Sequence, residues 1–442
     1  MANPTEAQAQ RILSRVVALA KATKGAEVLA TLNATTAGNT RFAVNEITSS
    51  ADVERITLTV TVQFGKRAAS ATTNQLDDRA IDGVVANARR LALLSPENPE
   101  AMPALGPQTY ARPKGASDPA TATLAPETRA KAVGAMIKAG DASKTTIAGF
   151  YEHEARAHAL ASSAGLWAYH AWTTAELTCT ARTADATGSG WAGTSSNRAG
   201  DLDAPALAKI AVDKALASAK PTKLDPGRYT VILEPAAVAD LLGWLSGSMS
   251  ARRADEGRSF FSKPGGGTRV GEKLFPETIT LRSDPAAVQL AALPYDREGV
   301  PLAPTAWIER GVVKALAYNR YWARKQNKPT TGQPGAWVLD GGKASRDELL
   351  KGVTRGVLIT RFWYLRSLDP QTLLVTGLTR DGTFLVENGA ITRPVTNFRF
   401  NESPVHMLAK CDAMTAGTIV GGMRVPALRT HEFNLASVSE AV

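Results

Sequence analysis

The residues with the clearest potential for chemistry are His153, Glu154 and His158, two imidazoles and a carboxylate within six positions. Zinc peptidases use such groups, with imidazoles binding the ion and a carboxylate activating a water. The flanking segments Thr145–Tyr151 and Ala159–Ala161 are typical of strands, however. Residues five apart on a strand face opposite sides of the sheet, so the two rings would diverge. A metal site at His153 and His158 is therefore an alternative hypothesis and not our main one.

Two further carboxylates, Asp296 and Glu298, precede Gly299. They could serve in acid–base catalysis, but Asp-x-x-Gly is also common in turns. Solitary histidines are more often structural than catalytic, which applies here to His170, His406 and His431. The sequence contains neither a G-x-S-x-G nucleophile motif nor a Walker loop, so it does not indicate a serine hydrolase or a P-loop enzyme.

The elements that must position these groups form a mixed pattern. Helical spacing near the N-terminus, followed by alternation over Glu54–Phe64, predicts a domain with a helix and an antiparallel sheet over residues 1–94. Four prolines within thirteen residues then predict a linker over residues 95–124. A middle α+β region over 125–226 and a larger, mostly antiparallel β domain with a few helices over 227–442 complete the prediction. The fold class is α+β.

The strongest local prediction is a three-stranded meander near the C-terminus. The segments Leu373–Arg380, Thr383–Glu387 and Ala390–Val395 alternate in the manner of strands. The dipeptides Asp381-Gly382 and Asn388-Gly389 separate them, and both accept the positive φ angles of tight hairpin turns.

Composition indicates a globular protein with a diffuse positive charge. The 442 residues include 51 Lys and Arg against 41 Asp and Glu, a net charge of +10. The longest basic runs are pairs with acids mixed among them, which disfavours nucleic acid as a partner. The chain shows no secretion signal and no apolar run of about 20 residues, and Cys179 and Cys411 stand far apart. We therefore expect a cytoplasmic protein with no membrane partner.

Several long stretches resemble the TldD/PmbA (TldE) family of metallopeptidase subunits. They recur in the family's order and cover most of the chain from about Tyr151 onward. The stretches are Ala161–His170, Gly188–Gly193, Tyr229–Ala236, Tyr295–Pro301, Val375–Gly389 and Phe398–Ser403.

The resemblance implies a cytoplasmic peptidase system in which a TldD-type subunit carries an H-E-x-x-x-H zinc motif on a helix. A TldE-type partner lacks that motif, and the two enclose a cavity. The motif positions correspond to Gly243, Trp244 and Ser248. Glycine has no side-chain ligand atom, an indole only donates a hydrogen bond and a neutral serine hydroxyl is a poor zinc ligand.

The resemblance thus implies a TldE-like, non-catalytic subunit of a heterodimer. We expect no cofactor in this chain, zinc in a TldD-like partner, and peptides or unfolded segments as substrates. Asp296, Glu298 and Arg380 lie in the matching stretches and are our candidates for the substrate cavity. Two alternatives remain. One is an autonomous metallopeptidase using His153, Glu154 and His158, and the other is a basic binding protein that modulates a nucleic-acid enzyme.

Overall fold

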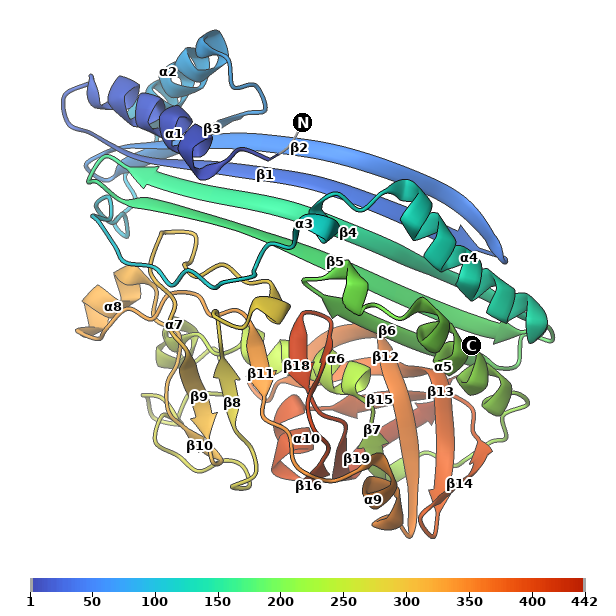
Figure 1. Ribbon diagram of the computed structural model, residues 1–442. Helices are drawn as coiled ribbons and strands as arrows, with labels where there is room; N and C mark the ends of the chain where they lie inside the picture. Colours follow the sequence, from blue (N-terminus) through green and yellow to red (C-terminus); the bar gives the residue numbers. More distant parts are fainter. Residues whose placement is uncertain (1–2, 440–442) are drawn as a thin grey trace.

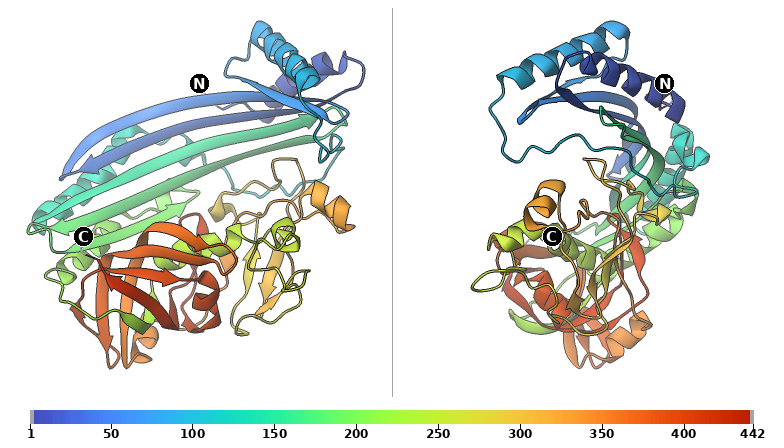
Figure 2. Two further views of the ribbon diagram at one scale, coloured as in Figure 1. Left: turned by 180° about the vertical axis from the view of Figure 1, so that it is seen from behind. Right: turned by 90° about the vertical axis from the view of Figure 1, so that its left-hand side faces the viewer.

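The computed structural model describes residues 3–439, and it confirms the predicted α+β class. A long sheet arches over a β-rich C-terminal part (Figures 1 and 2). Its strands pair in the order β3-β2-β1-β4-β5-β6. They are β1 (Ala26–Ala43), β2 (Glu46–Phe64), β3 (Arg67–Thr73), β4 (Thr145–Ser162), β5 (Trp167–Thr183) and β6 (Ser189–Ser196).

Helices cover one face of this sheet. Leu58, Val60 and Val62 of β2 alternate inward and pack beneath the first two helices. Further along, Val133 and Met136 pack with residues of β1, β4 and β5. The helices are α1 (Glu6–Lys21), α2 (Asp78–Leu94), α3 (Pro119–Ala122), α4 (Pro126–Ala142) and α5 (Ala204–Ala217), with a 3-10 turn at Ala199–Asp201. The opposite face is therefore left for the C-terminal part (Figure 2).

The C-terminal part contains a sheet in the order β12-β7-β19-β15-β13-β14, with β16 paired to β19. Because β12 also pairs with β13, five of these strands close into a ring. The strands are β7 (Gly227–Leu233), β12 (Arg355–Asp369), β13 (Leu374–Glu387), β14 (Ala390–Pro394), β15 (Phe398–Glu402), β16 (Cys411–Met414) and β19 (Leu428–Val438).

A second sheet of short strands lies beside this ring, in the order β10-β9-β8-β11-β18-β17. Its strands are β8 (Leu281–Ser283), β9 (Thr305–Glu309), β10 (Val312–Val313), β11 (Trp337–Leu339), β17 (Thr418–Val420) and β18 (Met423–Val425). The helices of this part are α6 (Pro235–Gly247), α7 (Ala251–Asp255), α8 (Arg320–Gln326), α9 (Arg346–Lys351) and α10 (Pro404–Ala409), with a 3-10 turn at Val288–Leu290.

The predicted meander is wrong at Asp381-Gly382. Strand β13 continues through this dipeptide, whose φ angles of 56° and 117° are those expected of a turn. Because β12 also continues, the two residues oppose Thr360 alone and form a β-bulge. Asn388 and Gly389 do form the predicted turn, into β14.

One sheet crosses the first predicted domain limit, and α3 lies inside the predicted linker over residues 95–124. Residues 95–118 contain no helix or strand, and β7 begins at Gly227. Strand β1 nevertheless pairs with β4 over fourteen positions, from Leu29↔Ser162 to Phe42↔Gly149. The predicted N-terminal and middle regions therefore share one sheet. Among the described residues, no helix is long and apolar enough to cross a membrane.

Candidate functional site

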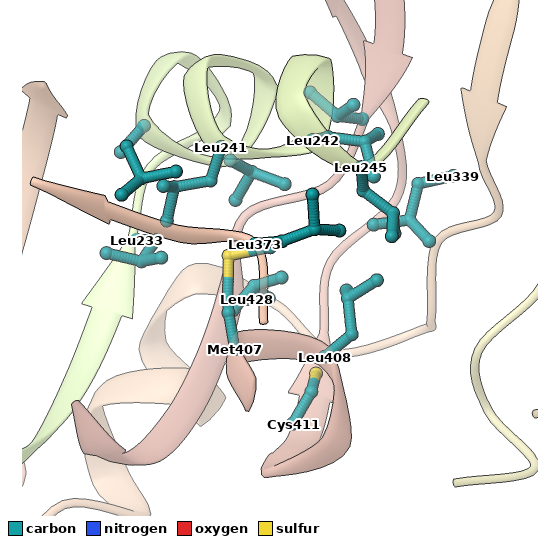
Figure 3. Close-up of a cluster of buried hydrophobic side chains, with 14 of the residues drawn as sticks. Leu233, Leu241, Leu242, Leu245, Leu339, Leu373, Met407, Leu408, Cys411 and Leu428 are labelled. Carbon is teal, nitrogen blue, oxygen red and sulfur yellow. The ribbon is translucent and has the colours of Figure 1, made fainter. Parts of the chain in front are cut away.

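Helix α6 carries the positions that the family motif would occupy. Leu241, Leu242 and Leu245 are completely buried in the C-terminal core, against leucines of the ring and the short sheet (Figure 3). Since these apolar residues fix the inner face, Gly243 and Trp244 lie on the outer part of the helix. They line a pocket of about 370 Å³, which we call the α6 pocket. Its walls are Asp240, Gly243, Trp244, Gly247, Ser248, Arg253, Ser367, Pro370 and Leu373.

The α6 pocket contains one carboxylate, that of Asp240. Its Oδ2 accepts a hydrogen bond of 3.1 Å from the backbone amide of Phe362. Burial raises the pKa of Asp240 to about 6, although the Phe362 amide and the nearby Arg361 charge act in the opposite direction. The Ser248 hydroxyl donates to the carbonyl of Leu245 at 2.7 Å. The pocket therefore offers hydrogen-bonding groups and one titratable acid.

The residues of the α6 pocket do not fit a zinc ion. A zinc site needs about three protein ligands with nitrogen, sulfur or carboxylate oxygen donors. Of the three motif positions, Gly243 supplies no donor atom and the Trp244 indole has no free electron pair in the ring plane. Across residues 3–439 no group of three His, Cys, Asp or Glu side chains is arranged to hold a metal.

The alternative metal ligands His153 and His158 lie on β4, where the predicted extended conformation is present. The Nδ1 atom of His153 is 3.4 Å from Nη1 of Arg129, a residue of α4 on the helix-covered face. Burial first, and the Arg129 charge second, lower the pKa of His153. Glu154 forms an ion pair with Arg156.

His158 turns to the other face of β4, toward the C-terminal part. Its Nδ1 atom is 3.1 Å from the hydroxyl of Tyr295. Burial, and to a lesser degree the proximity of His170, lower the pKa of His158 to about 4. The two rings of the rival metal hypothesis thus contact groups on opposite sides of the sheet.

The candidate cavity residues Asp296 and Glu298 lie together in one turn. Asp296 Oδ1 accepts hydrogen bonds of 2.9 Å from the amides of Glu298 and Val300, which is typical turn chemistry. Glu298 is 3.5 Å from Arg320 and lines a cavity of about 330 Å³. Burial raises the pKa of both carboxyl groups.

The third candidate, Arg380, lies apart from this turn. It is on β13, where its guanidinium lies 4.2 Å from the ring centre of Trp363. In the strand register it stands directly opposite Arg361 of β12. The sequence patterns do not indicate Arg361 as a site residue. Its pairing with Arg380 depends on a long-range contact, and the only local signal is that Arg361 interrupts an apolar, strand-like run.

Two family models match the chain. The model of the PmbA/TldA metallopeptidase central domain matches residues 116–219, and that of the C-terminal domain of the same family matches residues 226–437.

Curated relatives include the metalloprotease PmbA of Escherichia coli O157:H7. It is 26% identical over 189 residues, which are 41% of this chain and 40% of the relative. A metalloprotease of Methanothermobacter thermautotrophicus is 25% identical over 231 residues, 48% of each protein. The matched region thus spans about half or less of the length of these relatives.

Solved structures share the fold over nearly the whole chain. TldE from Thermococcus kodakarensis superposes with a TM-score of 0.86 at 18% identity, covering 96% of this chain and 99% of that one. A candidate modulator of a DNA gyrase from Thermotoga maritima gives a TM-score of 0.87 at 19% identity, with the same coverage. From the two matched domains, the chain belongs to the PmbA/TldD family of metallopeptidase-like proteins.

Proposed function

We propose that this chain is a TldE-like, non-catalytic subunit that pairs with a zinc-bearing TldD-like subunit in the cytoplasm and helps to hold peptides in an enclosed cavity. The observation that carries the proposal is the chemistry of the α6 pocket. The motif positions Gly243, Trp244 and Ser248 face or border this pocket, and none provides a zinc ligand. Helix α6 is thus present in this chain, but its motif positions carry residues that are unsuited to bind zinc.

The β6 edge of the long sheet supports a role in holding peptides. Strand β6 ends the sheet order and borders a groove of about 630 Å³. The backbone groups of Ser189 and the carbonyl of Trp191 bond to side chains of α5 and its C-cap, Ser218 and Lys214, so they point away from β5. By alternation, the backbone groups of Gly193 also point away from β5. Since Ser189 and the Trp191 carbonyl already have these partners, a peptide would add as a further strand from Gly193 onward, where main-chain hydrogen bonds would bind it whatever its side chains.

Reconstitution tests the proposal. The chain is purified alone and together with a zinc-bearing TldD-like subunit, and zinc content and peptide hydrolysis are measured for each. We expect hydrolysis from the pair and from neither the chain alone nor a pair whose partner has lost its zinc ligands. Two substrate peptides can be N-methylated at alternate residues, one at the odd positions and one at the even positions. One of them should bind the chain more weakly than the other, since only every second backbone amide of an added strand faces β6.

The two alternative functions predict different results. About one tightly bound zinc per chain, with unaided hydrolysis that His153→Ala abolishes, would establish the autonomous metallopeptidase instead. The nucleic-acid alternative predicts binding to DNA that weakens steeply with salt. We expect no such binding, since many of the basic side chains are already in ion pairs, such as Arg15 with Asp78 and Arg310 with Glu277.

A further inference from the structure

Two arginines face each other across β12 and β13. Arg361 and Arg380 are directly paired in the antiparallel register, and like charges at such positions repel. One carboxylate, Asp381, lies between them, with its Oδ2 3.7 Å from Arg361 Nε and its Oδ1 3.8 Å from Arg380 Nε. Asp240 of α6 also interacts with Arg361, and Arg182 adds a third positive charge near Arg380. Three guanidinium groups against two carboxylates leave an excess of positive charge.

The carboxylate of Asp381 is buried and hydrogen-bonded to the neighbouring strand β6. Its side chain is 3% exposed, and its Oδ1 accepts a hydrogen bond of 2.6 Å from the hydroxyl of Ser189 on β6. The bulge at Asp381-Gly382 places this side chain between the two arginines. Asp381 therefore acts as a positioning residue: its buried carboxylate orients the two more exposed guanidinium groups.

An aromatic ring lies beside each of the two guanidinium groups. Arg361 lies 4.9 Å from the ring centre of Trp191, and Arg380 lies 4.2 Å from that of Trp363. These cation–π contacts help to hold the two guanidinium groups in place. Within the described part of the chain, neither guanidinium group donates a hydrogen bond to another residue, and the two side chains are 26% and 21% exposed. The pair is thus oriented and accessible.

The pKa of Arg380 also indicates that other positive charges lie close to it. Burial first, and then the charges of Arg182 and Arg361, lower the pKa of Arg380, although Asp381 acts in the opposite direction. Trp363 is 42% exposed beside the pair and offers apolar surface next to the charge. Planar guanidinium groups bind planar carboxylates through two parallel hydrogen bonds.

We propose that Arg361 and Arg380 form a binding site for a carboxylate of the peptide substrate, either its C-terminal carboxylate or an acidic side chain. The proposal rests on the proposed function for the nature of the ligand. Asp381 and the two tryptophans orient the arginines, and the arginine donors bind the carboxylate.

Binding of labelled peptides to the purified chain, followed by fluorescence anisotropy, tests the site. Four probes separate the ligand sources. These are a neutral peptide with a free C-terminus, its C-terminal amide, the amide with one internal Glu, and inorganic phosphate as a competitor. We expect the first or the third peptide, or both, to bind at least about tenfold more tightly than the neutral amide.

Variants connect the binding to the two arginines. Arg361→Met and Arg380→Met should each weaken binding of the carboxylate-bearing peptide at least about tenfold. Arg361→Lys and Arg380→Lys should retain part of the binding. Arg310→Met, which removes an exposed arginine paired with Glu277, is the matched control and should bind as the unmodified chain does. Circular dichroism of each variant establishes that it is folded.

Three outcomes would overturn the proposal. They are equal binding of the neutral amide and the acidic peptides, binding of phosphate without binding of any peptide, and unchanged peptide binding in the Arg361→Met and Arg380→Met variants. Because the measurement uses the chain alone, it is independent of the zinc and hydrolysis tests, so failure of one proposal is distinguishable from failure of the other.

Discussion

Asp240 is the residue on which the chemistry of the α6 pocket depends. It lies three positions before Gly243 on α6, accepts the Phe362 amide, and is the only carboxylate among the residues that line the pocket. Its raised pKa, about 6, means that folding favours the protonated acid. A pocket whose residues do not fit a zinc ion thus retains a group with a pKa of about 6.

Asp240→Asn tests this at the residue scale. A folded pKa above the unfolded value of about 3.9 contributes stability that is present below pH 4 and lost as pH rises through 6. The amide keeps an acceptor for Phe362 and does not ionise. We therefore expect the variant to be more stable than the unmodified chain at pH 7.5, by up to about 2–3 kcal/mol, and nearly equal to it at pH 4.

Urea unfolding at several pH values measures the difference. Asp369→Asn is a control of opposite sign, because hydrogen bonds from Thr372 and Gln371 lower the pKa of this partly exposed carboxyl group. Equal stabilities of the Asp240→Asn variant and the unmodified chain at every pH would show that Asp240 has an ordinary pKa.

At the scale of elements, the bulge in β13 decides where Asp381 and the arginine pair lie. Gly382 has a φ of 117°, which side chains other than hydrogen rarely accept. A Cβ atom there would also approach the Thr360 hydroxyl to 2.8 Å and the Phe384 ring to 2.9 Å. The bulge therefore requires glycine at this position for two independent reasons.

Gly382→Ala should reduce the free energy of unfolding by roughly 1–3 kcal/mol or more. Gly421→Ala is the matched control, since Gly421 also has a positive φ, 56°, but a Cβ atom there would meet nothing within 4 Å. Its cost should be about 1 kcal/mol or less. Denaturant unfolding of both variants checks the difference, and equal costs would mean that β13 is not constrained at the bulge.

At the scale of the whole molecule, the turn containing Asp296 joins the C-terminal part to the long sheet. Tyr295 is buried against Leu160, Leu166 and Ala168. Its hydroxyl donates to the carbonyl of His158 at 3.0 Å, so the Nδ1–H of the neutral His158 ring donates to the hydroxyl oxygen. One phenol group thus satisfies two polar groups of β4.

Tyr295→Phe leaves both groups of His158 buried without this partner, so we expect a loss of about 1–3 kcal/mol in stability. Tyr110→Phe removes a bond of 2.7 Å to the Gly299 carbonyl in the same region, from a less buried hydroxyl, and should cost less. Hydrogen exchange would locate the effect, which we expect in β4 and in residues 293–301. A change confined to the turn would mean that this contact does not join the two parts.

Much of the fold follows from local patterns. Alternation over Glu54–Phe64 predicted part of β2, and Asn388-Gly389 predicted the turn into β14, because burial of one face and tight-turn preference are properties of short segments. The sequence by itself also determined that Gly243 and Trp244 cannot bind zinc, since ligand atoms belong to residue types.

Tertiary structure decided the rest. Asp381-Gly382 has the φ angles that local preference predicts, but whether the chain reverses there depends on the partner strand β12, which continues and turns the dipeptide into a bulge. The same long-range pairing places Arg361 opposite Arg380, nineteen positions away. Local conformational preference is encoded residue by residue, whereas the juxtaposition of charges depends on strand register, and register is set by the packing of the whole sheet.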